Sequence, residues 1–433
     1  MLYYSTNHQS PKATLQDAVV KGLAPDRGLF MPDHINQLPS EFLQTIDQLS
    51  FQEIAFRVAN AFFGDDMEAD TLRNIVYETL SFETPVVKVE PNIFTLELFH
   101  GPTMAFKDVG ARFMARLLGY FIKKQNQTDV NVLVATSGDT GSAVANGFLD
   151  VDGIHVYVLY PKGLVSEIQE KQFTTLGKNI TALEIDGTFD DCQRLVKTAF
   201  MDDDLNQKLN LTSANSINVA RFLPQAFYYF NAFAQLKKIG KADQVVMSVP
   251  SGNFGNLTAG LFAKRMGLPI KRFIAANNRN DIFLNYLQTG NYEPRSSVAT
   301  IANAMDVGDP SNFARIIDLY DASHEAICND ISGYRYTDEQ IKDGVRTCYT
   351  KTDYLLDPHG ACGYLALKEG LKPDETGLFL ETAHPAKFKD TIETIIHQSI
   401  TVPERLQYFM EKEKQNIALS NQYDDLKSCL LKR

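Results

Sequence analysis

One lysine in the sequence stands where it could act as a nucleophile. Lys107 follows Phe106 in the segment LFHGPTMAFKDVGARFM and opens a predicted helix. An amine beside an apolar ring and the positive end of a helix loses solvation and meets unfavourable charge, and both effects lower its pKa. Such an amine is suited to forming a Schiff base. The competing interpretation, which holds for most lysines, is a solvated surface charge.

A glycine-rich segment, SVPSGNFGNLTAGLFAKRMG, predicts a phosphate-binding loop between a strand and a helix. Glycine lets the backbone approach an anion closely, and the first amides of a helix supply unpaired donors. The candidate residues are Gly252, Asn253, Phe254 and Asn256. The loop has neither the Lys-Ser/Thr ending of a Walker loop nor the spacing GxGxxG, which disfavours nucleotide binding. A plain strand-to-helix turn is the alternative.

A second cradle of small polar residues follows another predicted strand, in ATSGDTGSAVANGF. Its amides and hydroxyls could bind a carboxylate, the group that every amino acid carries. The candidates are Ser137, Gly138, Asp139 and Thr140, with helix capping as the alternative for Asp139. Two cradles in one chain suggest a phosphorylated cofactor together with an amino acid.

These loops need a framework, and the sequence predicts an α/β fold with parallel sheets. Short apolar runs begin at residues 93, 130, 154, 180, 244, 270 and 377, and helical patterns alternate with them. Parallel strands covered on both faces place ligands at their carboxyl ends, where the loops above lie. We expect a mainly helical domain over residues 1–90 and two α/β lobes. One lobe spans 91–240, the other spans 241–433, and the two could exchange segments.

Composition limits the class of protein. A chain of 433 residues with 44% hydrophobic and 22% charged residues is expected to form two or three globular domains. The net charge of −11 disfavours nucleic acids and anionic membranes as partners. Apolar stretches long enough for a membrane span or a signal peptide are lacking, and the five cysteines form no CxxC pair. We therefore expect a cytoplasmic protein with no metal site, and a polar tail after Thr401 that forms a surface helix.

Four motifs in order, HGPTMAFKD, TSGDTGSA, VPSGNFGN and ETAHPAKF, resemble those of the bacterial and fungal threonine synthases, enzymes of pyridoxal-phosphate fold type II. The resemblance begins at GLAPDRGLFMP and spans nearly the whole chain. One departure is Asn7, where the family commonly has arginine after Ser-Thr.

The resemblance implies a fold like the tryptophan synthase β subunit, two lobes around a cofactor cleft, with pyridoxal 5′-phosphate as cofactor. Lys107 would form the Schiff base, Gly252, Asn253, Phe254 and Asn256 would hold the cofactor phosphate, and Thr382 would face the pyridine nitrogen. The implied reaction converts O-phospho-L-homoserine and water to L-threonine and phosphate. Plant-type activation by S-adenosylmethionine is not expected.

The leaving phosphate needs cations or donors, and the candidates are Lys162 and the group Asn215, Ser216 and Arg221. The resemblance implies that the substrate phosphate lies near the segment of that group. We expect Ser216 and Arg221 about one turn apart at the start of a helix, where the alternative is a cap plus a surface ion pair. Three histidines flank the matched segments. His100 could line the pocket, whereas we expect His359 and His384 to bond to backbone at loop corners.

Three other functions stay open at this point. A serine or threonine dehydratase of the same fold type, or a phospholyase that eliminates phosphate without adding water, would share the lysine and both cradles. A noncatalytic protein that binds a phosphorylated ligand would need the loops alone. The sequence gives no pattern for association, and a monomer or a homodimer is compatible with it.

Overall fold

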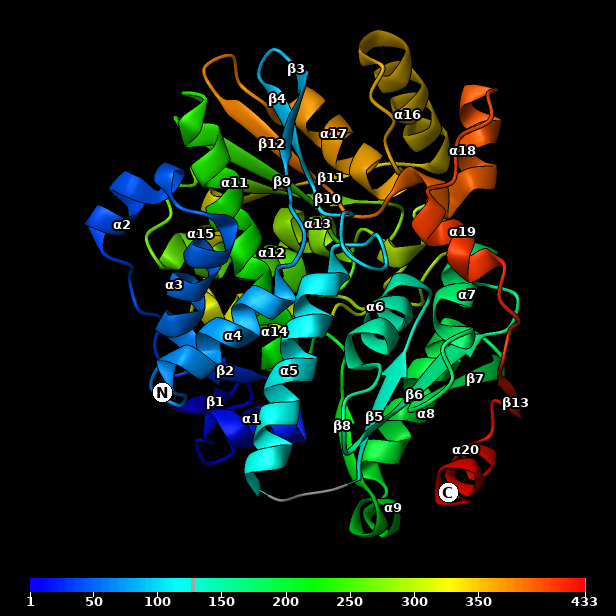
Figure 1. Ribbon diagram of the computed structural model, residues 1–433. Coiled ribbons are helices and arrows are strands. Elements are labelled where there is room, and N and C mark those ends of the chain that lie inside the picture. The colour runs from blue at the N-terminus through cyan, green and yellow to red at the C-terminus, as the bar shows by residue number, and fades with distance from the viewer. Residues whose placement is uncertain (126–128, 433) are drawn as a thin grey trace.

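Two open sheets form the framework of the protein (Figure 1). The computed structural model describes residues 1–125 and 129–432. Within them the large sheet has the strand order β11-β10-β9-β12-β4-β3 and the small sheet the order β13-β7-β6-β5-β8. The large sheet contains β3 (Val86–Glu90), β4 (Ile93–Glu97), β9 (Val245–Pro250), β10 (Arg272–Asn277), β11 (Ile331–Arg335) and β12 (Thr376–Glu381). The small sheet contains β5 (Val130–Ala135), β6 (Ile154–Pro161), β7 (Ile180–Asp186), β8 (Asn210–Ser213) and β13 (Ile417–Ser420).

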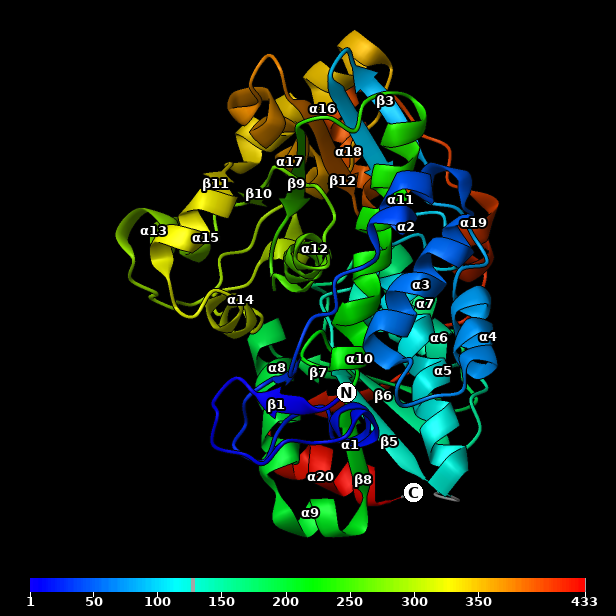
Figure 2. The same cartoon turned by 90° about the vertical axis from the view of Figure 1, so that its left-hand side faces the viewer.

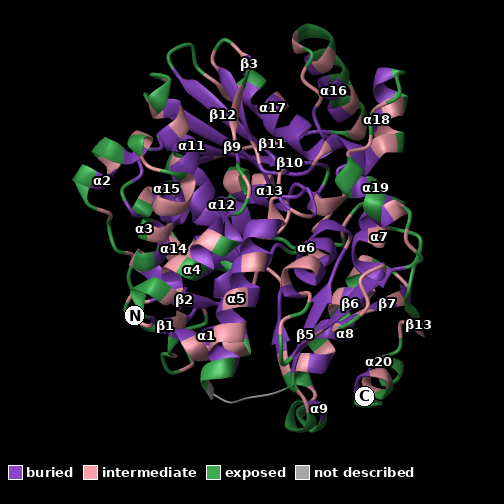
Figure 3. Ribbon diagram, in the orientation of Figure 1, coloured by how far each residue is buried: buried purple, intermediate pink, exposed green. Residues whose placement is uncertain are grey.

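The central strands are buried on both faces, as their apolar sequences require (Figure 3). Every residue of β5, β9 and β12 is buried. Neighbouring strands pair in parallel in both sheets, apart from β3, which pairs with β4 in antiparallel. The predicted α/β class with parallel sheets is therefore confirmed.

Helices cover the sheets. Helix α17 packs on β9, β10 and β12, while α8 packs on β5 and β6, and α20 packs on α8. The helices after residue 100 are α5 (Lys107–Gln125), α6 (Asp139–Phe148), α7 (Glu167–Thr174), α8 (Phe189–Met201), α9 (Asp203–Lys208), α10 (Val219–Phe222), α11 (Ala226–Lys238), α12 (Gly255–Arg265), α13 (Ile282–Thr289), α14 (Phe313–Leu319), α15 (His324–Asp330), α16 (Asp338–Thr352), α17 (Pro358–Gly370), α18 (Lys389–Ile396), α19 (Glu404–Met410) and α20 (Tyr423–Leu431). Short 3-10 turns add η2 (Leu223–Gln225), η3 (Asn303–Met305) and η4 (Pro385–Phe388).

The N-terminal part is mainly helical, as predicted. It contains α1 (Leu15–Lys21), α2 (Ser40–Thr45), η1 (Ile46–Gln48), α3 (Phe51–Phe63) and α4 (Ala69–Thr79), together with the antiparallel pair β1 (Tyr3–Ser5) and β2 (Phe30–Pro32). The apolar stripe of α3 is buried, and the Ser50 hydroxyl caps this helix by accepting a hydrogen bond from the Glu53 amide.

The chain crosses between the sheets more than once. Strand β4 precedes the small sheet in sequence but pairs with β12 of the large sheet. Strand β13, near the end of the chain, pairs with β7 of the small sheet (Figure 1). The helix that follows it, α20, lies against α8 (Figure 2). The predicted surface helix after Thr401 is therefore incomplete, because this tail also supplies a strand, and Leu426 and Leu430 of α20 are fully buried. The predicted boundaries at residues 90 and 240 stay a prediction.

Candidate active site

Loops from five strands meet at one pocket. Three adjacent strands of the large sheet, β4, β12 and β9, are followed by Lys107, Thr382 and the segment 251–256, and all of these line the pocket. The adjacent strands β5 and β8 of the small sheet contribute Ser137 and Thr140, and Asn215, Ser216 and Arg221. Residues far apart in sequence converge because the carboxyl ends of parallel strands share one edge.

Lys107 begins α5, and its amine points toward the loop after β5. The Nζ atom donates a hydrogen bond of 2.8 Å to Thr140 Oγ1. Burial lowers the pKa of Lys107 to about 8, against a raising effect of Asp139 and further lowering by Arg221 and Lys387. Because an amine with this pKa is partly neutral near pH 8, it can act as a nucleophile or as a base.

The glycine-rich segment forms a turn that opens α12. Phe254, the N-cap, has a left-handed backbone with φ of 61°, which is unusual outside glycine and is held by ring contact with Phe283. Gly252 lies so close to the 304–305 segment that an added Cβ would stand 2.8 Å from Met305 Cα. No acidic residue lies in the first turn of α12. The turn therefore presents helix amides to the pocket.

Asn256 adds a side-chain donor to this turn. The Tyr229 hydroxyl donates to Asn256 Oδ1 at 2.7 Å, which fixes the orientation of the amide group. Its Nδ2 atom is buried with no hydrogen-bond partner among the described residues. A buried unpaired donor is costly unless a ligand accepts from it, so this turn suits an anion such as a phosphate.

A second polar group follows β8 and includes Arg221 of α10. The buried Arg221 donates from Nε to Ala214 O at 2.8 Å and from Nη1 to Lys107 O at 3.0 Å. Burial lowers the pKa of Arg221 to about 10, which leaves it charged at neutral pH. Ser216 lies in the turn before α10, whose N-cap is Asn218, so it stands outside the helix at whose start it was expected, and both Ser216 and Arg221 line the pocket.

The side chain of Asn253 joins the two polar groups. Its Nδ2 donates to Ser216 Oγ at 3.3 Å, and its Oδ1 accepts from the Ser311 amide at 2.7 Å. Asn312 also donates to Ser216 Oγ, at 3.0 Å. The hydrogen-bonding capacity of Asn253 is thus largely used within the protein, and its backbone is the part available to a ligand.

Three predicted residues do not line the pocket. Lys162 is exposed in the loop after β6. Asp139 is buried and forms an ion pair with Lys387, Nζ to Oδ1 at 2.5 Å. Gly138 has a φ of 143° and lies against the side chain of Gln169. The turn that contains Gly138 and Asp139 nevertheless positions Ser137 and Thr140 at the pocket wall.

The histidines differ from expectation in two respects. His359 lines the pocket, bonds through Nδ1 to Asp357 Oδ1 at 2.5 Å, and accepts through Nε2 from the Ala304 amide at 3.1 Å. His384 accepts from the Ala386 amide at 3.1 Å, as predicted for a loop corner, and burial lowers its pKa to about 4. His100 instead pairs with Glu97 at 2.7 Å and is not among the residues lining the pocket.

Several wall residues were not foreseen. The segment 304–307 lines the pocket beside the glycine-rich turn, against Gly252, and Gln193 and Gln225 also line it. Burial raises the pKa of Asp306 to about 6, although Thr300 and Asn278 donate hydrogen bonds to it. Segment 304–307 lies in a region without helical or strand periodicity, so no sequence signal marked it.

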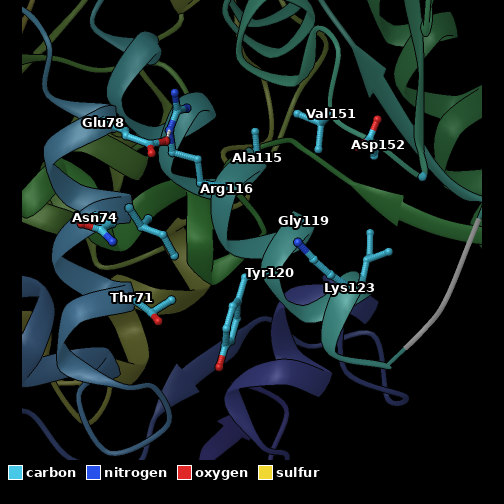
Figure 4. Close-up of a pocket in the computed structure, with 13 residues that line it drawn as sticks. Thr71, Asn74, Glu78, Ala115, Arg116, Gly119, Tyr120, Lys123, Val151 and Asp152 are labelled. Carbon is cyan, nitrogen blue, oxygen red and sulfur yellow. Dashed lines mark hydrogen bonds and ion pairs between the residues drawn. The ribbon is translucent and has the colours of Figure 1, made fainter.

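A separate surface groove lies between α4 and the later turns of α5 (Figure 4). Ala115, Gly119, Arg116 and Glu78 are among the residues that line it, and Arg116 pairs with Glu78 at 3.0 Å. Ala115, Arg116 and Gly119 follow Lys107 on α5 by eight positions or more, which is about 12 Å along the helix axis or farther. The groove is therefore not part of the pocket around Lys107.

Comparisons with known proteins agree with this geometry. Residues 78–382 match the family described as "Pyridoxal-phosphate dependent enzyme", residues 2–80 match "Threonine synthase N terminus", and residues 360–429 match "Threonine synthase, C-terminal". The threonine synthase of Haemophilus influenzae is 45% identical over 432 residues, which cover 100% of both chains. That of Escherichia coli K12 is 44% identical over 409 residues, 94% of each chain.

Solved structures give the same result. The crystal structure of threonine synthase from Escherichia coli superposes with a TM-score of 0.94 and covers 100% of both chains, over which the identity is 40%. A structure of threonine synthase from Brucella melitensis with bound pyridoxal phosphate has a TM-score of 0.92 at 34% identity. It covers 99% of this chain and 98% of that one.

Proposed function

The chain belongs to the threonine synthase family of pyridoxal-phosphate-dependent enzymes, and from this premise we propose that it converts O-phospho-L-homoserine and water to L-threonine and phosphate. One observation carries the proposal: Lys107, the turn with the unpaired Asn256 amide, and Arg221 line a single pocket. The reaction requires this combination, because the cofactor phosphate and the substrate phosphate each need a site beside one reactive amine.

The residues present suit pyridoxal phosphate. Amides of residues 252–256 and Asn256 Nδ2 would hold its phosphate, Thr382 would face its pyridine nitrogen, and Lys107 would bond to its aldehyde. When bound, the cofactor supplies an electrophilic aldehyde and a ring that withdraws electrons from the carbon beside the substrate amino group. A neutral hydroxyl at Thr382 would leave the ring nitrogen largely unprotonated and moderate that withdrawal.

Lys107 would also move protons. Once the substrate amino group has replaced Lys107 on the cofactor aldehyde, Nζ would be free. Its lowered pKa would then let it accept a proton from a substrate carbon and return one later. The hydrogen bond to Thr140 directs Nζ toward the loop 137–140. Ser137 and Thr140, with the amides of this loop, would bind the substrate carboxylate there and so bring the carbon within reach of Nζ.

Departure of phosphate requires positive charge and donors. Arg221, Asn215 and Ser216 would supply them, because all three follow β8 in the chain and line the pocket. A direct contact from Lys162 would require its exposed loop to move. The Lys162→Ala variant tests that contact, and an unchanged KM would remove Lys162 from the substrate site.

Product analysis tests the function. Purified protein with pyridoxal phosphate and O-phospho-L-homoserine should release L-threonine and phosphate in equal amounts. A phospholyase would give phosphate with a keto acid, and a dehydratase would ignore the substrate. Borohydride should fix the cofactor on Lys107, and Lys107→Ala should abolish both the label and the reaction. A ligand-binding protein would remain unlabelled and release no product.

The cellular location and the oligomeric state of the protein are also proposals. Among the described residues no helix is long and apolar enough to cross a membrane. We propose that the enzyme acts on its small-molecule substrate in the cytoplasm, as a monomer or a homodimer, and its net charge of −11 supports a protein that avoids anionic surfaces. Cell fractionation and light scattering would test the two statements.

A further inference from the structure

A buried ion pair stands behind the pocket wall. Asp139 is the first residue of α6, and Lys387 belongs to η4, in the motif AHPAKF near the other end of the chain. The side chains are 4% and 0% exposed, and Lys387 Nζ lies 2.5 Å from Asp139 Oδ1. Two buried charges are held at a large desolvation cost, so their placement requires a reason beyond stability.

Lys387 contacts two loops of the site at once. Besides pairing with Asp139, its Nζ donates to Thr103 O at 2.9 Å, in the loop that leads to Lys107. Gln172 of α7 donates to the same Thr103 oxygen at 2.9 Å, and Gln169 donates to Asp139 Oδ1 at 2.9 Å. The cation therefore connects the loop before Lys107 with the loop 137–140.

The charge of Lys387 also matters at the pocket. Asp139 precedes Thr140, which accepts the hydrogen bond from Lys107 Nζ. A carboxylate at the start of α6 opposes the positive helix end that would attract the substrate carboxylate, and like charges at such a site weaken binding. Because Lys387 pairs with Asp139, the two charges largely cancel where the substrate carboxylate would approach.

The charges of this pair act on neighbouring titratable groups. Asp139 raises the pKa of Lys107, while Arg221 and Lys387 lower it. Asp108 and His384 also feel the charge of Lys387. An electrostatic role for Lys387 therefore predicts opposite effects on Lys107 when Lys387 or Asp139 is replaced singly.

We propose that Lys387 is a positioning residue for the reaction: it cancels the charge of Asp139 so that the loop 137–140 can bind a carboxylate, and it fixes that loop to the loop of Lys107. This role deepens the proposed function and rests on it, because it concerns binding of the substrate carboxylate. The ion pair between Lys387 and Asp139 itself does not depend on which group leaves the substrate. The competing role is mechanical, in which only the bond to Thr103 matters.

Two substitutions separate these roles. The K387M variant loses both the charge and the bond to Thr103, whereas the D139N variant loses the charge but keeps an oxygen to accept from Gln169. The double variant D139N/K387M restores neutrality without restoring the bond to Thr103. A mechanical role predicts that the double variant is at least as impaired as K387M, and an electrostatic role predicts recovery.

The first experiment uses the protein without cofactor and is independent of the reaction. Trinitrobenzenesulfonate modifies neutral amines, and peptide mass spectrometry reports the extent at Lys107 as a function of pH. We expect K387M to raise the midpoint, D139N to lower it by about one pH unit, and the double variant to lie near the unchanged protein. K389M is the matched control, since Lys389 pairs with Glu393 on the surface and should leave the midpoint unchanged.

The second experiment measures the KM for O-phospho-L-homoserine. K387M should raise the KM about tenfold through like-charge repulsion, and the double variant should return it to within about threefold of the unchanged enzyme. If K387M does not fold, the lowered midpoint of D139N and the KM of the double variant carry the test. The proposal is overturned if D139N leaves the midpoint unchanged, or if the double variant binds substrate no better than K387M.

Discussion

Replacing Asn256 with leucine tests the proposed cofactor-phosphate turn most directly. The side chain is 6% exposed, and its Nδ2 has no protein partner among the described residues. Leucine has a similar shape and no donor. The Tyr229 hydroxyl keeps a partner after the change, because it also contacts the Asn256 backbone oxygen at 3.0 Å. The substitution therefore removes one donor without leaving another buried group unpaired.

The size of the effect follows from the kind of bond. A hydrogen bond to a charged group contributes about 1.5–3 kcal/mol, and a phosphate is charged at neutral pH. The Kd for pyridoxal phosphate should therefore rise by about 10- to 150-fold in Asn256→Leu. Titration of the cofactor-free protein, followed by absorbance of the bound cofactor, measures this Kd.

Tyr229→Phe is the matched control. It retains the Asn256 donor but removes the hydroxyl that orients the amide, so the Kd should rise by only about threefold, the effect of one neutral hydrogen bond. An unchanged Kd in Asn256→Leu would refute the assignment of this donor to the phosphate. A raised Kd accompanied by an equal loss of thermal stability in the cofactor-free protein would refute it too.

Three further outcomes follow from the site. The rate of Schiff-base formation between added pyridoxal phosphate and the cofactor-free protein should rise with pH to a plateau with its midpoint near 8, because the lowered pKa of Lys107 makes the amine neutral above that pH; a midpoint near 10 would contradict this. Arg221→Ala should lower kcat/KM for O-phospho-L-homoserine about a hundredfold in steady-state kinetics, and indifference would exclude Arg221 from phosphate binding. Arg315→Met should lower the free energy of unfolding by about 3 kcal/mol in thermal denaturation, since this fully buried guanidinium donates to the backbone oxygens of Phe30 and Ser216; an unchanged Tm would contradict it.

The main strands and the loops with chemistry could be predicted, because both leave local signals. Continuous apolar runs predicted β5, β6, β9 and β12, and small residues after them predicted the turns around Gly252 and Ser137. Edge strands such as β8, β11 and β13 are short and partly exposed, so their sequences lack a distinct apolar run. Their existence depends on pairing with strands that are distant in the chain.

The direction of individual side chains could not be predicted in the same way. Asp139 and Thr140 are adjacent in one motif, yet Thr140 faces the pocket while Asp139 faces Lys387. That difference is set by a lysine near the other end of the chain, which no local pattern reveals. Lys162 likewise follows a strand end, but its loop lies open to solvent.

The crossing of the chain between the sheets has a consequence for synthesis in the cell. Strand β4 leaves the ribosome long before its neighbour β12, and β7 must wait for β13 to complete its edge. Neither of the two large sheets is built from a contiguous stretch of chain, so truncation before residue 417 removes a strand from a sheet whose other members were made much earlier. Such distant pairings slow folding, and the small sheet can be completed only after residues 417–420 have been synthesised.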